Sequence, residues 1–234
     1  MSTPELHLHT LYTFDQAGRI VSTREPRPAI GPAFTLIRSR ADRVWAVGES
    51  VAPDLADELD ALAAQERPLD NWREPPRFAE RYHALLAGEL RSGPALTFPY
   101  QIETPSDVSL IDDPRLLNRH FRDWTSEEAP ARRPMATILE DGHAVSLCAC
   151  ARRTDEAAEA SLETAEPFRG RGLAVRVTAA WAAAVRSSGR IPLYSTSWEN
   201  AASLAVARKL NLSIYAASWS LYAQSYDDRL LPPK

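Results

Sequence analysis

The sequence predicts an α/β fold, and three stretches carry that prediction. Residues 158–164 alternate between apolar and polar side chains, which is typical of a β-strand. Residues 173–185 are almost all apolar, with Arg176 as the only charge, which predicts a helix buried against a sheet. Residues 136–149 have the pattern of two strands joined by a tight turn. Such strands and a buried helix indicate a sheet that is covered by helices.

Length and composition limit the classes of protein that fit. The chain has 234 residues, of which 44% are hydrophobic and 25% are charged, as in an ordinary soluble domain with a substantial core or two small ones. The net charge of −4 argues against a general nucleic-acid-binding protein. No apolar run is long enough to span a membrane, and residues 1–20 lack a basic start followed by an apolar run. We therefore expect a cytoplasmic protein that binds neither nucleic acid nor a membrane.

Residues 93–105 are rich in proline and mark the best candidate for a domain boundary. We expect a small N-terminal α+β unit over residues 1–105 and a second domain over residues 106–234. The first unit contains a predicted hairpin and two amphipathic helices, at residues 33–37 with 43–47, 55–64 and 77–87. None of its residues carries recognisable chemistry. We interpret it as a unit that packs on the second domain, shapes a substrate pocket or makes a dimer contact.

A strand is expected over residues 95–102, and a helix is expected to begin at Pro114, because proline fits the first turn of a helix. The apolar side of that helix would hold Leu116, Leu117, His120, Phe121 and Trp124. His120 is a conceivable general base. A lone histidine on such a face is more often a packing residue, and we favour that interpretation.

The clearest hairpin joins residues 136–140 to residues 143–149. The Asp141-Gly142 pair between them is typical of a type I′ turn, in which both central residues take positive φ. Strand alternation gives two faces, one with Val145, Leu147 and Ala149 and one with Ser146, Cys148 and Cys150. The two cysteines would point in parallel, which is poor geometry for a disulfide. We interpret them as small core residues, since no histidine spacing supports a nucleophilic cysteine.

A glycine-rich turn over residues 168–174 joins the strand to the buried helix. The first turn of a helix carries backbone N–H groups that lack partners inside the helix, and such groups bind anions. Gly170 and Gly172 would let an anion approach the backbone, and Arg169 and Arg171 add positive charge at the same place. The turn thus predicts a phosphate-sized site, and a plain strand-to-helix turn is the alternative.

The strand before this turn has one wholly polar face. Glu159, Ser161 and Glu163 lie on it, while the other face is mainly apolar. A polar face on a strand in mid-sheet opens either on a cleft or on solvent. Beside an anion-binding turn, a cleft is the favoured interpretation.

Three blocks of the sequence, over roughly residues 110–222, resemble the GNAT superfamily of N-acetyltransferases. The family's acetyl-coenzyme A signature is Gln or Arg, two residues, Gly, one residue, then Gly or Ala, and here Arg169, Gly172 and Ala174 fill it. Residues 198–203 resemble the family's Asn-x-x-Ser block, and residues 209–212 stand where the family usually has Lys-Leu-Gly-Phe. The Glu-Thr pair before the signature most resembles the branch that includes zwittermicin A resistance-type acetyltransferases.

The resemblance implies a GNAT fold, which is a mixed, mostly antiparallel twisted sheet flanked by helices, here preceded by the smaller α+β unit. Two central strands, residues 158–164 and 192–196, would splay apart and bind the pantetheine arm of acetyl-CoA, a co-substrate, between them. The cofactor-binding residues implied are Thr164, Arg169, Gly170, Arg171, Gly172, Leu173, Ala174, Asn200 and Ser203. Asn200 is also expected to cap its helix. No metal is expected.

The implied reaction is acetyl transfer to a primary amine of an unidentified acceptor, with a small molecule favoured. We expect Glu163 to act as the base or to orient the amine, with Glu159 as the second choice. The family often uses a tyrosine as the acid, and Ala207 stands at that position, so Tyr194, Tyr215, Tyr222 or a water would have to replace it. The alternatives are an acyl-CoA sensor without turnover and an interaction protein. A homodimer is possible.

Overall fold

The computed structural model describes residues 3–122 and 124–223. The strands described are β1 (Tyr12–Phe14), β2 (Ile20–Thr23), β3 (Phe34–Arg38), β4 (Arg43–Val47), β5 (Glu89–Thr97), β6 (Ser109–Ile111), β7 (Met135–Glu140), β8 (His143–Arg153), β9 (Ala157–Thr164), β10 (Ile191–Ser195) and β11 (Ser213–Tyr222). The helices described are α1 (Thr3–Leu11), α2 (Pro53–Ala63), α3 (Ala79–Leu86), η1 (Pro114–Leu117), α4 (Ala129–Arg132), η2 (Glu166–Phe168), α5 (Leu173–Ser187) and α6 (Ala201–Lys209).

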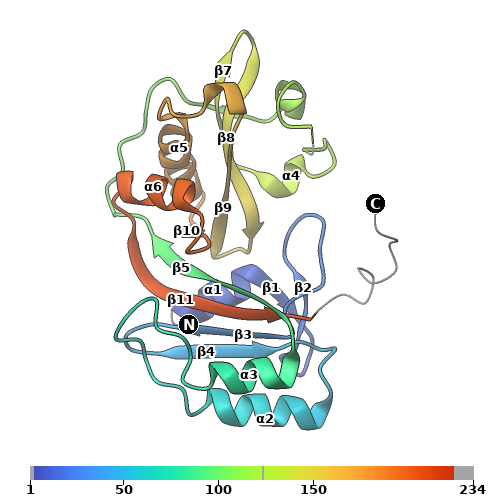
Figure 1. Cartoon of the computed structure of the whole chain (residues 1–234). Helices are drawn as coiled ribbons and strands as arrows, with labels where there is room; N and C mark the ends of the chain where they lie inside the picture. The colour runs from blue at the N-terminus through green and yellow to red at the C-terminus, as the bar shows by residue number, and fades with distance from the viewer. Residues whose placement is uncertain (1–2, 123, 224–234) are drawn as a thin grey trace, which may run out of the picture.

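Nine of the described strands form one sheet, in the order β4-β3-β11-β5-β10-β9-β8-β7-β6, and β1 and β2 form a separate pair. The β9–β10 pair is parallel, and the other neighbours in the large sheet are antiparallel. Helices α5 and α6 lie on one side of β9 and β10, and α2 and α3 lie beside β3 and β4 (Figure 1). The predicted fold class, a mixed and mostly antiparallel sheet flanked by helices, is confirmed.

The hairpin of β7 and β8 is confirmed together with its turn. Asp141 has φ 51° and Gly142 has φ 75°, so both central residues take the positive φ that a type I′ turn requires. One detail of the face assignment was wrong. The register shifts between Ile138 and Leu139, and Val145 packs in the cluster that contains Cys148, because a bulge reverses the alternation of the strand at this point.

Helix α5 forms the centre of the main core. Trp181, Val177 and Val185 are fully buried and pack with residues of β7, β8 and β9. Cys148 and Cys150 are free and buried in the same cluster, which agrees with their interpretation as core residues. Burial raises the pKa of the Cys150 thiol to about 11 and raises that of Cys148 well above its ordinary value.

The predicted hairpin and the two predicted helices of the first unit are present as β3–β4, α2 and α3. They enclose a second core around Phe34, Tyr82 and Trp219, whose rings contact one another. Trp219 belongs to β11, so the two predicted units share this core.

The large sheet crosses the predicted boundary. β5 precedes residue 105, and it pairs with β11 over most of its length and with β10 at its end, so it lies between two strands of the second predicted domain. The division at residues 105 and 106 remains a prediction. Residues 224–234 of the predicted second domain lie outside the described residues.

Two predicted elements were wrong in extent. The strand expected over residues 95–102 is β5, which ends at Thr97. The helix expected from Pro114 is only the short 3₁₀ helix η1, although Pro114 begins it and Asp113 caps it by accepting a hydrogen bond from the Arg115 N–H at 2.9 Å. Tertiary packing explains this, since the buried side chains of Leu117 and Phe121 fill a small core under β7 and β8 without a continuous helix.

The feature that positions the site is the parting of β9 from β10. Their parallel pairing joins Ile191 to Ala157 and ends at the pair of Leu193 with Glu159. Beyond that pair β9 continues to Thr164 with a hydrogen-bonded neighbour on its β8 side, whereas β10 turns to pair with β5. The β10-facing edge of residues 160–164 is therefore left open.

Candidate active site

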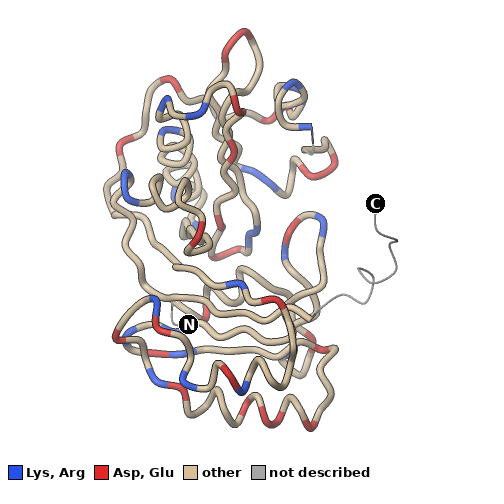
Figure 2. Tube along the Cα trace, in the orientation of Figure 1, with Lys and Arg blue, Asp and Glu red and all other residues tan. Residues whose placement is uncertain are grey.

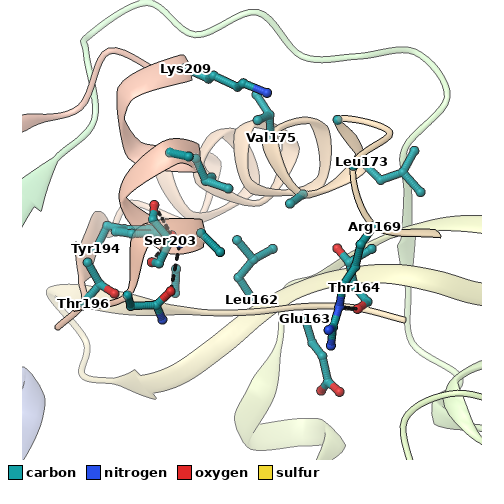
Figure 3. Close-up of a pocket in the computed structure, with 18 of the residues that line it drawn as sticks. Leu162, Glu163, Thr164, Arg169, Leu173, Val175, Tyr194, Thr196, Ser203 and Lys209 are labelled. Carbon is teal, nitrogen blue, oxygen red and sulfur yellow. Dashed lines mark hydrogen bonds between the residues drawn. The ribbon is translucent and has the colours of Figure 1, made fainter. Parts of the chain in front are cut away.

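A cavity of about 510 Å³ lies where β9 and β10 part (Figure 3). The second half of β9, the glycine-rich turn, the end of β10 and one side of α6 form its walls. Ala160, Leu162, Glu163 and Thr164 line it from β9. The side chains of Ala160, Leu162 and Thr164 lie on the strand face that is turned to α5 and α6, whereas the Glu163 side chain points away from it. The structure thus brings the predicted turn, the open strand edge and the Asn-x-x-Ser block to one cavity.

The turn has the geometry that its glycines predicted. Gly170 and Gly172 have φ of 79° and 78°, a conformation that other residues adopt only with strain, and a Cβ atom on either would meet nothing within 4 Å. Gly172 is the N-cap of α5 and no side chain caps this helix, so the first-turn N–H groups of α5 remain for an anion. Leu173 and Ala174 line the cavity at this point.

The two arginines of the turn differ in their placement. Arg169 lines the cavity and donates from Nε to the Thr164 carbonyl oxygen at 3.2 Å, which ties the turn to the end of β9. Arg171 is directed to Glu140, with 2.6 Å between Nη2 and Oε1, and lies over the ring of Phe168. Arg171 is not among the residues that line the cavity, in contrast to the other predicted residues of this turn.

Asn200 and Ser203 both line the cavity, at the start of α6. Asn200 Oδ1 accepts the Ser203 backbone N–H at 3.0 Å, so the predicted cap is confirmed. The Ser203 hydroxyl lies 2.7 Å from the Tyr194 hydroxyl of β10. These contacts fix the first turn of α6 against the end of β10.

The sequence interpretation missed Lys209 as a site residue. It lines the cavity together with three alanine and valine residues of α6, and Ala205, Val206 and Lys209 follow Ala202 by three, four and seven residues. That spacing is one face of a helix, so the periodicity after Asn200 could have identified Lys209 as a second cation facing the site. Figure 3 shows Lys209 at the far end of α6, on the same side as Val175.

The polar face of β9 lies on the opposite side of the sheet from this cavity. Figure 3 shows the Glu163 side chain pointing away from Leu162 and the two helices. Glu163 is exposed, and its Oε2 accepts a hydrogen bond from Trp124 Nε1 at 3.2 Å. His120 packs edge-on against Phe168 at 5.5 Å between ring centroids, as expected for a packing residue.

Glu159 corrects the expectation that the whole polar face opens on a cleft. It is only 2% exposed, because α1 packs against this end of β9. Its carboxylate accepts hydrogen bonds from Ser195 Oγ and Arg152 Nη1, and His7 Nε2 of α1 lies 3.9 Å away. Alternation along a strand shows which residues share a face, but it does not show which element covers that face.

The charges of this buried cluster determine its protonation. Burial raises the pKa of Glu159, but the charge of Arg152 and the hydrogen bonds from Ser195 and Arg152 outweigh it, so the net pKa is lowered and the carboxylate is ionised. Burial lowers the pKa of His7 against the opposing effect of Glu159, so His7 is neutral at pH 7. The cluster is therefore an anionic Glu159 held by Arg152 and Ser195, beside a neutral imidazole.

The three tyrosines considered as the acid lie in different places. Tyr194 is the one that lines the cavity, and burial raises its pKa to about 12, so it is a protonated hydroxyl at pH 7. Tyr215 hydrogen-bonds to His7 Nδ1 on the other side of the sheet. Tyr222 lies near the end of β11, where Arg91 covers its ring. Ala207, at the family's tyrosine position, is buried in the main core.

A family model described as GNAT acetyltransferase matches residues 136–217, which contain the turn and the start of α6. The solved structure of a GCN5-related N-acetyltransferase from Kribbella flavida is 20% identical, with a TM-score of 0.50, and the match covers 73% of this chain and 74% of that chain. The comparisons support the GNAT acetyltransferase superfamily.

Two further solved structures share the GNAT description at lower similarity. A GNAT-family protein from Novosphingobium aromaticivorans is 17% identical, with a TM-score of 0.49, and the match covers 58% of this chain and 66% of that chain. A GCN5-related N-acetyltransferase-like protein from Streptococcus suis is 18% identical, with a TM-score of 0.46 and coverage of 81% and 84%. A search of the curated proteins found no match.

Two negative findings apply to the described part of the chain. Residues 3–122 and 124–223 contain no group of three or more His, Cys, Asp and Glu side chains that could hold a metal ion. None of the helices described there has both the length and the apolar character needed to cross a membrane.

Proposed function

We propose that the protein transfers an acetyl group from acetyl-CoA to a primary amine, with a small molecule as the favoured acceptor. The observation that carries this proposal is the open edge of β9 beside the uncapped N-terminus of α5. An extended pantetheine arm can pair with such an edge as an added strand, while its pyrophosphate is held by the N–H groups of the turn. We further propose a cytoplasmic location and, from the Glu163-Thr164 pair, the zwittermicin A resistance-type branch.

Positive charge supports the placement of the cofactor. Arg169 lies at one end of the cavity and Lys209 at another, and each can pair with a phosphate of the cofactor. The backbone of residues 160–164 then lies along the pantetheine arm, and Thr164, Asn200 and Ser203 add polar groups to the wall. Arg171 contributes to the field at the turn but is paired with Glu140.

The reaction requires three proton transfers. The acceptor ammonium first loses one proton, and its nitrogen then bonds to the thioester carbon to give a tetrahedral intermediate. As the carbon–sulfur bond breaks, the nitrogen loses a second proton and the departing thiolate takes one, so the products are the acetamide, coenzyme A and one released proton. The protein must therefore supply a base on the amine side and an acid on the sulfur side.

We propose Glu163 as the base, with Glu159 as the second candidate. Glu163 is exposed on the sheet face opposite the cofactor cavity, where an amine can reach it. Glu159 reaches the same region only through Ser195, whose hydroxyl donates to its carboxylate and whose residue lines the cofactor cavity. In this second arrangement Ser195 passes the proton between the amine and Glu159.

We propose Tyr194 as the acid that protonates the thiolate. It lines the cavity, it is protonated at pH 7, and it comes from β10 rather than from α6, where Ala207 leaves no hydroxyl. Its contact with Ser203 Oγ, 2.7 Å away, orients the hydroxyl.

Two measurements test the proposed function. Calorimetric titration should show acetyl-CoA binding to the purified protein. Thiol release with a panel of amines, with acetylated products identified by mass spectrometry, should show turnover. Failure of acetyl-CoA to bind would contradict the proposal and favour an interaction protein.

A second candidate function is an acyl-CoA sensor without turnover. The specific observation in its favour is Ala207, a buried core residue at the position where the family often has its acid. Tight acetyl-CoA binding without acetylation of any amine in the panel would support the sensor over the enzyme.

A further inference from the structure

A groove lies on the other side of the end of β10 from the cofactor cavity. It consists of two adjoining cavities of about 560 and 900 Å³ that share Glu89, Arg91, Arg152 and Tyr222. The first of them also shares Ser195 and Thr196 with the cofactor cavity. Ser195 and Thr196, at the end of β10, therefore form a wall that the groove and the cofactor cavity have in common. In the proposed function the thioester lies beside this common wall, so one end of a molecule in the groove lies next to the thioester.

Alternate residues of β5 and β11 form the floor of this groove. The cross-strand pairs Gly93 with Ser218, Arg91 with Ser220 and Glu89 with Tyr222 put these side chains on one face. The other face of β11 carries Trp219 and packs on α2 and α3. Because β5 precedes residue 105, the first unit supplies half of the floor.

The missing side chain of Gly93 allows β5, in the groove floor, to lie in contact with the backbone of Thr196 in the common wall. A Cβ atom at Gly93 would lie 1.7 Å from the carbonyl oxygen of Thr196, so a larger residue would displace the chain where β10 ends. The backbone contact between β5 and Thr196 therefore fixes the groove next to the cofactor cavity.

Two buried polar atoms in the groove wall lack partners among the described residues. Arg152 pairs with Glu159 and with Glu25, and this leaves its Nε without a hydrogen-bond partner. Glu25 pairs through Oε1 and leaves Oε2 without one. One is a donor and the other is an acceptor, so the polar atoms behind this wall carry both polarities.

The charges of the groove are balanced. Its described lining contains three carboxylates and three guanidinium groups, from Glu25, Glu89, Glu199, Arg27, Arg91 and Arg152. Figure 2 shows basic and acidic residues intermixed along the trace as well. The three guanidinium groups would repel a polyamine, and the three carboxylates would repel a polyanion. A zwitterion finds an oppositely charged partner for each of its two charges.

We propose that the groove binds the acceptor and that the acceptor is a zwitterion, a primary amine whose carrier bears a carboxylate. This inference rests on the proposed function. The amine lies at the common wall of Ser195 and Thr196, and the carboxylate lies at Arg91. Glu163 does not line the groove, so in this arrangement the base is the second candidate, Glu159, which Ser195 joins to the wall.

Arg91 is the arginine that can take a ligand carboxylate. Arg152 already holds two carboxylates, those of the buried Glu159 and the half-buried Glu25, and Arg27 pairs with Glu128. Arg91 is exposed and pairs only with Glu89 of its own strand among the ion pairs described, at 3.0 and 3.2 Å. Its guanidinium lies 4.3 Å from the centroid of the Tyr222 ring, which fixes its plane over the groove floor. An exposed ion pair contributes little to stability, so a ligand carboxylate can replace Glu89 at small cost.

The test compares each amino acid with its amide, which keeps the amine and removes the carboxylate charge. Thiol release is measured with the wild-type protein for the panel of amino acids, their amides, spermidine and glucosamine. We expect the best substrate to be an amino acid, with kcat/KM at least about tenfold above that of its amide, as for loss of one charge-assisted pair. Arg91→Gln should raise KM for that amino acid about tenfold, remove its advantage over the amide, and leave the Kd of acetyl-CoA unchanged.

A matched control is available at Arg115. It is exposed and forms the same kind of two-residue pair, with Asp113, outside the groove. Arg115→Gln should therefore preserve the preference for the amino acid. Circular dichroism verifies the fold of each variant. If Arg91→Gln does not fold, Arg91→Lys replaces it in the test. This variant keeps the positive charge but lacks the paired N–H donors of the guanidinium, so it should lose part of the preference for the amino acid over its amide.

The outcomes separate this inference from the proposed function. If acetyl-CoA does not bind, both are wrong. If it binds and an amide, spermidine or glucosamine is the best substrate, or if no amine is acetylated, the zwitterion inference is overturned and the cofactor site stands. A preference for the amino acid that survives in a folded Arg91→Gln variant would also overturn it.

Discussion

At the scale of single residues, Arg169 and Gly172 are the two residues that we propose to hold the cofactor's pyrophosphate. The double variant Arg169→Ala with Gly172→Asp removes a cation and places a carboxylate at a residue with φ 78°, at the N-cap of α5. We expect acetyl-CoA affinity to fall at least about tenfold, since each charge-assisted contact contributes roughly 1.5–3 kcal/mol. Calorimetric titration of the folded variant checks this, and unchanged affinity would contradict the site. Arg171→Ala should cost less, because Arg171 pairs with Glu140.

Glu163 and Glu159 differ in burial, and this difference makes their roles separable. A general base contributes about 10²–10⁴-fold, so Glu163→Gln should lower kcat within that range and remove the acidic limb of the pH–rate profile, while acetyl-CoA still binds. If Glu163→Gln has near-normal turnover and the same profile, Glu163 is not the base. Ser195→Ala then tests the route through Glu159, because it removes the hydroxyl that joins this carboxylate to the wall.

Tyr194 offers a change of a single oxygen atom. Tyr194→Phe keeps the ring in the core and removes the hydroxyl that contacts Ser203. If Tyr194 is the acid, kcat should fall by about 10²-fold or more, with little change in the Kd of acetyl-CoA. The comparison of kcat with Kd, by steady-state kinetics and calorimetry, decides this, and an unchanged kcat would exclude the role.

Helix α6 depends on its cap, and the cap also lies in the cavity wall. Asn200→Ala removes the acceptor of the Ser203 N–H and should cost about 1 kcal/mol of stability. Asn200→Asp keeps most of the cap. We expect Asn200→Asp to retain the melting temperature but to raise KM for acetyl-CoA, because in the proposed function the amide also faces the pantetheine arm. If both quantities are unchanged in Asn200→Asp, Asn200 is a cap alone.

At the scale of elements, short sequence signals predicted turns and helix caps correctly, whereas the predicted lengths of some helices and strands were wrong. Asp141-Gly142 specified its turn, and Asn200 specified its cap, since each depends on a few neighbouring residues. The helix predicted from Pro114 failed because its apolar spacing is satisfied by packing under β7 and β8 in a short turn. Arg169, Asn200 and Ser203 could be placed at one site from the sequence, whereas Lys209 required attention to the face of α6.

At the scale of the whole molecule, α1 closes the sheet over a buried cluster that makes stability depend on pH. Burial lowers the pKa of His7 below its ordinary value of 6.5 in the folded protein, and Glu159, Arg152 and Tyr215 face it from β9, β8 and β11. The unfolded chain therefore binds a proton more readily, so the stability contributed above pH 6.5 is lost as the pH falls through the folded pKa. Glu159, whose pKa is lowered from 4.5, adds a further loss at lower pH.

We predict that the melting temperature falls between pH 6.5 and pH 5 and that His7→Gln flattens this fall. The variant should also be less stable at pH 7.5, because it loses the contact with Tyr215. His9→Gln, on the same helix, is the matched control and should keep the wild-type slope, since His7 remains. Thermal melts at half-unit pH steps check this, and equal slopes in the His7→Gln variant and the wild type would contradict it.

The sequence by itself determined the parts of this protein that depend on short-range physics. These are the α/β class, the hairpin of β7 and β8, the turn from Arg169 to Ala174, and the cap of α6. Only the tertiary structure decided that β5 lies between β10 and β11, that α1 buries Glu159, and that a groove adjoins the cavity where β9 and β10 part. The physical reason is that turns, caps and periodicity are set by neighbouring residues, whereas strand order and the covering of a face are set by contacts between residues far apart in the chain.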